Sequence, residues 1–137
     1  MLKVELGLDF WRASCLWRKK IELSFVELGI THPQFIVLYH LSRYCDQIQN
    51  QKDLALAAGI DVATLSQIVR LLEKRNLLKR RHFKGDERAK HLKLTTEGLA
   101  ILSSAIEKYH QANLNFFNPK LLNPVEFQAN LLKLISS

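Results

Sequence analysis

Cysteine is scarce in this chain, and metal-ligand spacings and catalytic motifs are missing. The two cysteines, Cys15 and Cys45, are too few and too widely separated to indicate a disulfide framework or a zinc site. The five histidines recur at no spacing that suits a metal ion, so neither a metal nor another cofactor is expected. The sequence also contains no catalytic dyad and no phosphate-binding loop, and we therefore predict no enzymatic activity.

Long apolar runs are also missing. No stretch approaches the roughly 18 consecutive apolar residues that a membrane span requires. The N-terminal segment MLKVELGLDFWR carries acids where a signal peptide needs an uninterrupted apolar stretch. These absences predict a cytoplasmic protein that has no membrane partner.

The composition is otherwise that of a folded globular protein. Apolar residues make up 47% of the 137 positions and charged residues 24%, and no internal repeat or low-complexity segment is found. Chains of this length usually form one domain with a real hydrophobic core, so residues 1–137 are expected to fold as a single domain.

Excess positive charge is present, and it is confined to one segment. The net charge is +7, from 20 Lys and Arg against 13 Asp and Glu. The segment from Arg70 to Lys93, which we call the basic block, contains ten of these cations and three of the anions, so the rest of the chain is neutral. A localised block favours a polyanionic partner, although a solvated basic face would have the same composition.

Apolar spacings of three and four predict two helices near the N-terminus. The first covers residues 5–28 and is placed to end at Gly29. Thr31-His32-Pro33-Gln34 is a capping box that starts the second helix, which should run to about Tyr44. The stripe of the first helix is Phe10, Ala13, Trp17, Ile21, Phe25 and Leu28, and the second should bury Phe35, Leu38 and Leu41.

A helix-turn-helix pattern follows. Asn50 caps a short helix that stops at Gly59, and Asp61 caps a helix over residues 62–75 that Asn76 is suited to end. The second helix should bury Leu65, Ile68, Val69 and Leu72. Its opposite side shows Ala63, Thr64, Ser66, Gln67, Arg70 and Lys74. Several of these side chains can donate to base edges and phosphates, as a DNA-reading helix requires.

The remaining elements are a hairpin and two helices, which makes the expected class mainly α with a small β-hairpin (α+β). Strands are expected at residues 78–83 and 89–94, on either side of a charged turn at 84–88. The hairpin should pack against the helices through Leu78, Leu92 and Leu94. Thr95 caps a helix over residues 96–115 with the stripe Leu99, Leu102, Ile106, Tyr109 and Asn113. Asn123-Pro124-Val125-Glu126 starts a last helix, whose apolar content is Leu131, Leu132 and Ile135.

Three stretches, in this order and spacing, carry a family resemblance. They are GITHPQFIVL from Gly29, NQKDLALAAGIDVATLSQIVRLLEKRNLLKRR from Asn50, and GDERAKHLKLTTEG from Gly85. Together they resemble the multiple antibiotic resistance regulator (MarR) family of bacterial transcription factors. The third stretch is the most specific, because it combines an Asp-x-Arg turn, a short strand and a Leu-Thr-x-x-Gly helix start.

The resemblance implies a winged helix-turn-helix lobe over residues 31–95 and a homodimer formed by helices in residues 1–30 and 96–137. Residues 62–75 would be the recognition helix, in the major groove of a palindromic operator in double-stranded DNA. Arg88 would reach the adjacent minor groove, and Asp86 would hold it from across the turn. The side chains expected at DNA are Asn50, Gln51, Thr64, Ser66, Gln67, Arg70, Lys74, Lys84, Asp86, Arg88 and Lys90.

Aromatic residues on the first helix exceed what one small core needs, which favours a subunit interface or a small-molecule pocket over core packing alone. In the resembled family the terminal helices dimerise, and a ligand or stress signal acts between them and the DNA-binding lobe. The residues expected to dimerise are Phe10, Trp11, Trp17, Leu131, Leu132 and Ile135. A small-molecule effector is expected, but no residue of its pocket can be named.

The leading function is therefore a sequence-specific, dimeric DNA-binding repressor. The resembled family often has an arginine at the position of Gln67 and a serine at that of Ala63, so the operator preference stays open. Two alternatives also stay open. One is a winged-helix module that binds protein or RNA, and the other is a redox-sensing regulator that acts through Cys15, whose simpler reading is a small buried apolar residue.

Overall fold

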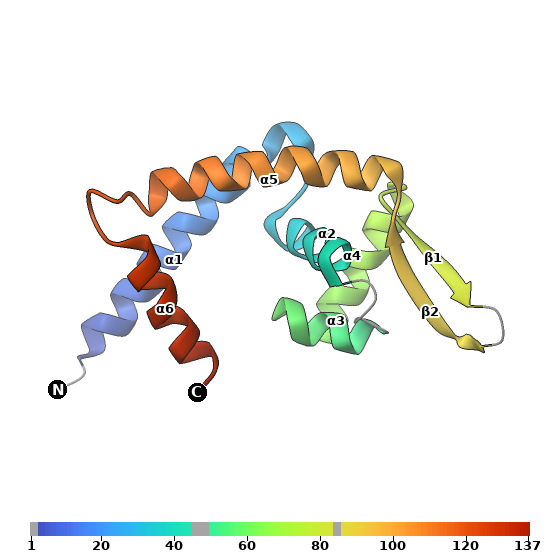
Figure 1. Ribbon diagram of the computed structural model, residues 1–137, viewed down its shortest axis with the longest axis horizontal. Coiled ribbons are helices and arrows are strands. Elements are labelled where there is room, and N and C mark those ends of the chain that lie inside the picture. Colours follow the sequence, from blue (N-terminus) through green and yellow to red (C-terminus); the bar gives the residue numbers. More distant parts are fainter. Residues whose placement is uncertain (1–2, 45–49, 84–85) are drawn as a thin grey trace. The chain divides into compact units, whose positions relative to one another are not determined.

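The computed structural model describes residues 3–44, 50–83 and 86–137, and for residues 81–83 and 86–91 it describes the backbone alone. Its helices and strands follow one another as shown in Figure 1. They are α1 (Val4–Ser24), the 3₁₀ turn η1 (Val26–Leu28), α2 (His32–Tyr44), α3 (Gln51–Ala58), α4 (Val62–Lys74), β1 (Leu78–Phe83), β2 (Asp86–Leu94), α5 (Thr96–Phe116) and α6 (Pro124–Ile135). A mainly helical chain with one antiparallel hairpin confirms the predicted fold class.

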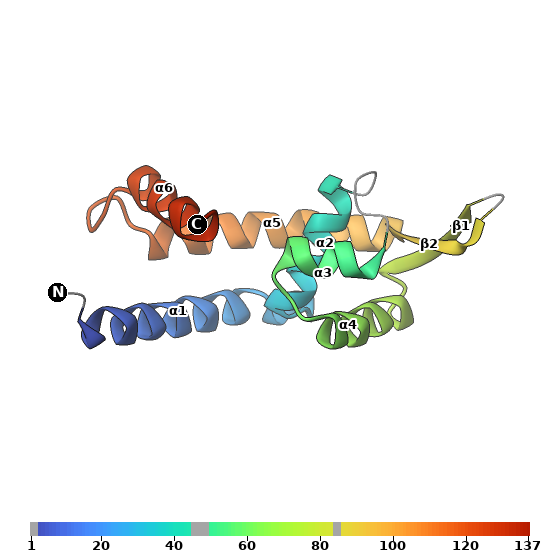
Figure 2. The same cartoon turned by 90° about the horizontal axis from the view of Figure 1, so that it is seen from below.

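The chain divides into two compact units, and α5 contributes residues to both. The terminal unit contains Met1–Ser24 and Glu107–Ser137, whereas the central unit contains Phe25–Ile106. In the central unit, α2 contacts α3, α4 and β2, and α4 contacts β1. Figures 1 and 2 show the hairpin extending away from these three helices in both views. The fully buried apolar side chains of this unit include Phe25, Leu38, Leu54, Leu65, Val69, Leu72 and Leu78.

The helix starts predicted from capping residues are confirmed. The Thr31 N–H donates to Gln34 Oε1 at 3.1 Å, and the Gln34 N–H donates to Thr31 Oγ1 at 3.2 Å. Asn50 Oδ1 accepts from the Asp53 N–H at 2.8 Å, and Asp61 Oδ1 accepts from the Thr64 N–H at 2.9 Å. These bonds satisfy backbone donors that the first turn of a helix leaves unpaired.

The predicted helix ends are also observed. Gly59 has φ 68° and Asn76 has φ 59°, so both adopt the left-handed conformation that ends a helix. At the first helix, however, the prediction of a single element over residues 5–28 is wrong, because α1 ends at Ser24. The chain then tightens into η1, which Gly29 ends at φ 66°. This break seats Phe25 in the core of the central unit, 5.2 Å from the Phe35 ring.

Strand β2 is longer than expected. It begins at Asp86 rather than at Ala89, because Asp86 already pairs with Phe83. The register then runs from His82 opposite Lys90 to Leu78 opposite Leu94, with an irregularity between His82 and Phe83. Of the three leucines expected to anchor the hairpin, Leu78 and Leu94 are buried and Leu92 is half-buried.

The junction of α4, the hairpin and α5 is held by Thr95. Its Oγ1 accepts from the Gly98 N–H at 3.0 Å, as a cap should, and also donates to the Asn76 carbonyl at 2.6 Å. The Thr95 N–H donates to the Leu77 carbonyl at 3.1 Å. Gly98 is buried, and a Cβ on it would overlap the same Leu77 carbonyl oxygen. The Leu-Thr-x-x-Gly motif therefore makes a close backbone contact between the start of α5 and Leu77, in the connection between α4 and β1.

The stripe expected on α5 is only partly buried. Leu102 is buried, but Leu99 is 52% exposed and Ile106 is 42% exposed. The side of α5 that faces the core of the central unit is instead formed by Gly98, Leu102 and Ala105. Two of these three residues are small, which lets the helix backbone approach its neighbours closely.

The terminal unit is organised around Trp17. Its Nε1–H donates to Asn113 Oδ1 at 2.9 Å, and its ring lies 6.1 Å from Tyr109 and 6.4 Å from Phe117. Burial raises the pKa of Tyr109 to about 12. Asn123 caps α6 as predicted, since its Oδ1 accepts from the N–H groups of Val125 and Glu126.

No single helix of the described segments is both long and apolar enough to cross a membrane. The pair α3 and α4, bent by 106°, passes the length and composition test only when the two helices are taken together.

Candidate nucleic-acid interface

One side of α4 is buried and the opposite side is open to solvent. Leu65, Ile68, Val69 and Leu72 form the buried side, as the sequence predicts. The predicted DNA-reading residues occupy the other side. Thr64, Gln67, Arg70 and Lys74 are exposed, and Ser66 is half-buried. The periodicity of the helix therefore places all five on a surface that a partner can reach.

Two hydroxyl groups on this surface are already bonded within the chain. The Thr64 hydroxyl donates to Asp61 Oδ2 at 2.6 Å, and the Ser66 hydroxyl donates to Gln51 Oε1 at 3.0 Å. The Thr64 hydroxyl, followed by the Thr64 N–H, lowers the pKa of Asp61. The structure thus brings two predicted DNA contacts, Ser66 and Gln51, together. Because a serine or threonine has only one O–H to donate, both hydroxyl protons are already used by partners inside the molecule.

The start of α3 lies in the same unit as this surface. Asn50 is exposed and uses its Oδ1 as the helix cap, while Gln51, the first residue of α3, is half-buried. Lys52 is exposed next to it. Both members of the predicted pair at the start of α3 are thus held in place: Asn50 by local capping, and Gln51 by its bond to Ser66 on α4.

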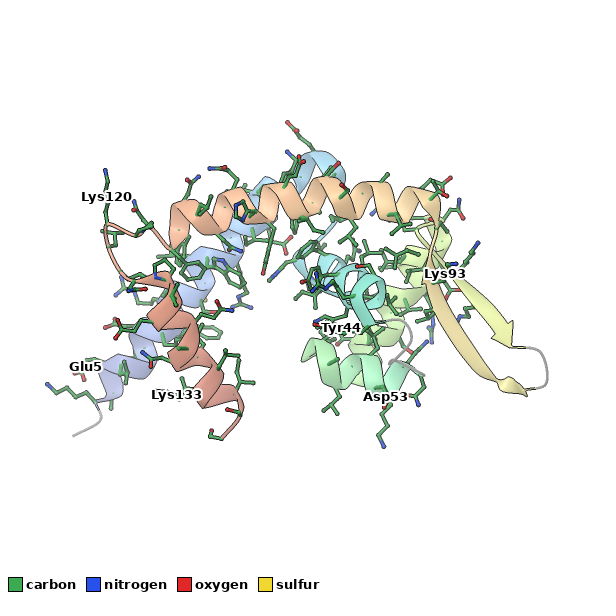
Figure 3. The ribbon with its side chains drawn as sticks, in the orientation of Figure 1. Glu5, Tyr44, Asp53, Lys93, Lys120 and Lys133 are labelled. Carbon is green, nitrogen blue, oxygen red and sulfur yellow. The ribbon has the colours of Figure 1, made fainter. Side chains whose placement is uncertain are left out.

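The hairpin changes the geometry expected at its tip. Asp86, Arg88 and Lys90 all belong to β2, so Asp86 and Arg88 do not face each other across a turn as expected, and a contact between their side chains stays a prediction. The two residues instead lie two positions apart on one strand. Their side chains and that of Lys90 are outside the described residues, as is Lys84 altogether. Lys93 is exposed on the same strand, and it is labelled in Figure 3.

Two cations of the basic block have internal partners that the sequence analysis did not find. Arg75 Nη1 donates to the Gly29 carbonyl at 2.6 Å. Arg80 on β1 forms an ion pair with Glu73 on α4, at 2.9 Å between Nε and Oε1. Neither pairing has a local sequence signal, because each joins different elements. The exposed cations of the basic block with described side chains include Arg70, Lys74, Lys79 and Lys93.

The residues expected to dimerise lie on α1 and α6 of the terminal unit. Phe10 is 59% exposed, Trp11 63%, Leu132 57% and Ile135 78%, whereas Trp17 and Leu131 are half-buried. A cavity of about 340 Å³ opens in the same unit. Its lining is Phe10, Ala13, Ser14, Trp17, Asn113, Phe116, Phe117, Phe127 and Leu131.

Cys15 is half-buried on α1, and Cys45 lies outside the described residues. Arg18 Nη2 donates to Cys15 Sγ at 3.6 Å, so a cation lies against the sulfur. Within the described segments, no three His, Cys, Asp or Glu side chains come together in a group that could hold a metal ion.

Comparison with known proteins points to one family. The sequence model of the MarR family matches residues 28–89. The uncharacterised HTH-type transcriptional regulator YdcH of Bacillus subtilis (strain 168) is 30% identical over 113 residues, which cover 77% of this chain and 76% of YdcH.

Solved structures of other proteins match nearly the whole chain, and two of them concern DNA binding. One is BpsR of Bordetella bronchiseptica, whose DNA binding is regulated by 6-hydroxynicotinic acid. It is 28% identical, with a TM-score of 0.78, over 97% of this chain and 99% of that one. The other is a variant of S. aureus MepR bound to an oligodeoxyribonucleotide. It is 25% identical, with a TM-score of 0.63, over 96% of each chain.

Proposed function

Since the chain belongs to the MarR family, we propose that it is a dimeric, sequence-specific DNA-binding repressor. A small-molecule or stress signal would weaken its binding to the operator. One observation carries the proposal. The exposed side of α4 presents Gln67 together with Arg70 and Lys74, and these two cations belong to the basic block that holds the whole net charge of the chain. Regulation, and not catalysis, is the proposed role, and the cytoplasm is the proposed location.

The relatives support both halves of the proposal. MepR has been seen with an oligodeoxyribonucleotide, and BpsR responds to a small aromatic acid. By analogy, α4 would enter the major groove, and β2 would bring Arg88 to the adjacent minor groove. Narrow minor grooves attract arginine because their negative potential is enhanced. The exposed lysines of the basic block would follow the phosphates.

Dimerisation would present two copies of α4 to one operator. The exposed apolar side chains of α1 and α6 supply a surface for it, because such residues gain about 25 cal/mol for each Å² removed from water. A two-fold dimer of this kind contacts two half-sites about one helical turn apart, so a palindromic operator is expected. The effector would change the separation of the two recognition helices. The cavity lined by Trp17 and Asn113 is one place from which it would act.

Selection of bound sequences from a random pool of double-stranded DNA tests the proposal. We expect a palindrome to be enriched, and its affinity to fall steeply between dilute and physiological salt because bound phosphates release counterions. Gln67→Ala should relax base preference at particular positions. Recovery of no discrete palindrome, or binding that is indifferent to salt, would favour the alternative of a winged-helix module for RNA or protein.

Oxidant sensing through Cys15 is a second candidate, favoured by the Arg18 contact with its sulfur. Oxidants also need access to the sulfur, and Cys15 is only half-buried. Treatment with peroxide should then lower operator affinity and consume one thiol, and Cys15→Ser should abolish the response. Unchanged affinity and thiol count after treatment would eliminate this candidate.

A further inference from the structure

We propose that Ser66 acts on DNA through Gln51: the Ser66 hydroxyl holds the Gln51 side-chain amide in the orientation from which it donates to an operator phosphate. This inference rests on the proposed DNA-binding function and assigns different roles to two residues of that surface. Gln51 is the residue that touches DNA. Ser66, although it lies on the recognition helix, is a positioning residue.

The contact that carries the inference joins α3 to α4. Ser66 Oγ lies 3.0 Å from Gln51 Oε1, in the range of a good O–H···O bond. The two residues are 15 positions apart in the chain, and both are half-buried. The bond therefore spans the helix-turn-helix and is not a local feature of either helix.

Hydrogen-bond inventories decide which residue remains able to donate. A serine has a single O–H, and here it points to Gln51. A glutamine amide has one oxygen acceptor and an NH₂ group with two donors. With Oε1 engaged by Ser66, the Nε2 donors remain for a partner that only accepts, and the phosphate oxygens of DNA are such acceptors.

Orientation is the benefit that Ser66 confers. A glutamine side chain loses rotamer entropy when it is fixed in one conformation. Because the Ser66 bond already restricts Gln51 in the free protein, less of that entropy is lost when DNA binds. Gln67, on the exposed side of α4, has no such bond among the described contacts and must be ordered by DNA itself.

The surroundings favour a phosphate over a base edge as the partner. Gln51 is the first residue of α3, where the helix dipole favours negative charge, and the exposed Lys52 follows it. Asn50 is occupied as the cap of this helix. The expected contact is thus independent of base sequence and fixes the position of α4 in the groove, since Gln51 is bonded to that helix.

The test is a double-mutant cycle in operator affinity with four proteins: wild type, Ser66→Ala, Gln51→Ala and the double variant. Gln51→Ala should weaken operator binding about tenfold, because a hydrogen bond to a charged group usually contributes at least that factor to affinity. Ser66→Ala should weaken it about threefold to tenfold, and the double variant should bind no worse than Gln51→Ala. Ser66→Thr keeps the hydroxyl and should restore most of the affinity.

Three further readouts separate positioning from a general loss of structure. Ser103→Ala, the same substitution at an exposed position of α5, should leave affinity unchanged. The slope of affinity against salt should not change in Gln51→Ala, because a neutral amide displaces no counterion. Gln51→Glu keeps an acceptor for Ser66 but replaces the donors with a negative charge, so it should bind worse than Gln51→Ala.

The outcomes are distinct. If the wild type selects no DNA, the proposed function fails and the inference fails with it. If the wild type binds its operator but the losses from Ser66→Ala and Gln51→Ala add, Ser66 contacts DNA independently and the inference is overturned while the function stands. Equal affinity of Gln51→Glu and the wild type would overturn it as well.

Discussion

Individual polar residues on the exposed side of α4 do not all have the same freedom. Thr64 completes the cap at Asp61, and Ser66 is bonded to Gln51, whereas Gln67 and Arg70 are exposed without a bond of this kind among the described contacts. Residue type and helical face can therefore suggest a DNA contact where the side chain is in fact hydrogen-bonded within the protein. The distinction matters for every substitution made there.

Gly98 is the position where the smallest change should have the largest structural effect. Gly98→Ala places a Cβ on the Leu77 carbonyl oxygen, so the start of α5 must move away from the connection between α4 and β1. We expect the free energy of unfolding to fall by about 1–3 kcal/mol, measured by urea denaturation. Gly7→Ala, on a helix face where nothing lies within 4 Å, is the control and should stabilise by roughly 0.5–1 kcal/mol. Equal effects of the two substitutions would contradict this account.

His40 should make stability depend on pH. Its Nδ1 is buried and has no hydrogen-bond partner among the described residues, and burial lowers the pKa of its imidazole below 6.5. In the unfolded chain the same imidazole gains a proton near pH 6.5, so stability is fully present above that pH and is lost as the pH falls toward the folded pKa.

Thermal unfolding between pH 7.5 and about 5 measures this effect. His40→Phe should flatten the dependence, because phenylalanine has no proton to gain in the unfolded state. His110→Phe, which alters an exposed histidine, should leave the profile as it is in the wild type. A profile that is unchanged in His40→Phe would rule out this histidine as the source.

Whole elements of the central unit are joined at two points near the base of the hairpin. Thr95 bonds to Asn76, just after α4, and to Gly98 in the first turn of α5, and the Arg80–Glu73 ion pair connects β1 to α4. A two-stranded hairpin is marginal by itself, so these contacts and the buried Leu78 and Leu94 decide its orientation. The orientation of the hairpin is thereby tied to that of α4.

Loss of the Thr95 hydroxyl should cost more than an ordinary helix cap. Thr95→Ala removes the bond from the Gly98 N–H and the bond to the Asn76 carbonyl, so we expect about 1–2 kcal/mol of destabilisation in chemical denaturation. Thr96→Ala is the matched control on the next, exposed residue and should change stability by less than about 0.5 kcal/mol. A loss as large in the control would show that the hydroxyl at position 95 has no special role.

The charge of the whole molecule should appear in the salt dependence of DNA binding. Each phosphate neutralised by a cation contributes about 0.9 to the slope of log affinity against log salt. Arg70→Ala should therefore weaken binding and reduce the slope by roughly 1, as fluorescence anisotropy titrations at several salt concentrations will show. Gln67→Ala is the control, since it should relax specificity and leave the slope unchanged. An unaltered slope in Arg70→Ala would remove Arg70 from the phosphate contacts.

The exposed apolar surface of the terminal unit should control assembly. Leu132→Glu places a charge in the proposed dimer interface, so dimer dissociation should move to higher protein concentrations in sedimentation equilibrium. Operator affinity should fall in parallel, because two linked recognition helices bind far better than one. Leu121→Glu alters a leucine that is 79% exposed and lies outside the proposed interface, and it should do neither. A Leu132→Glu protein that stays dimeric would move the interface elsewhere.

Local signals account for most of what could be predicted. The caps at Thr31, Asn50, Asp61 and Asn123 bond to N–H groups two or three residues away, so the sequence contains both partners within one turn. The buried side of α4 follows from helical periodicity in the same way, and the basic block is visible in the order of charges alone. These features, together with the class of fold and the resemblance to the MarR family, follow from the sequence alone.

Contacts between elements decided the rest. The end of α1 at Ser24 depends on Phe25 packing against Phe35, and the start of β2 depends on its pairing with β1. The bond from Ser66 to Gln51 joins residues 15 positions apart on different helices, so no pattern in the sequence predicts it. Periodicity predicts which residues share a face, but only packing brings the faces of separate elements together and determines which donors remain for DNA.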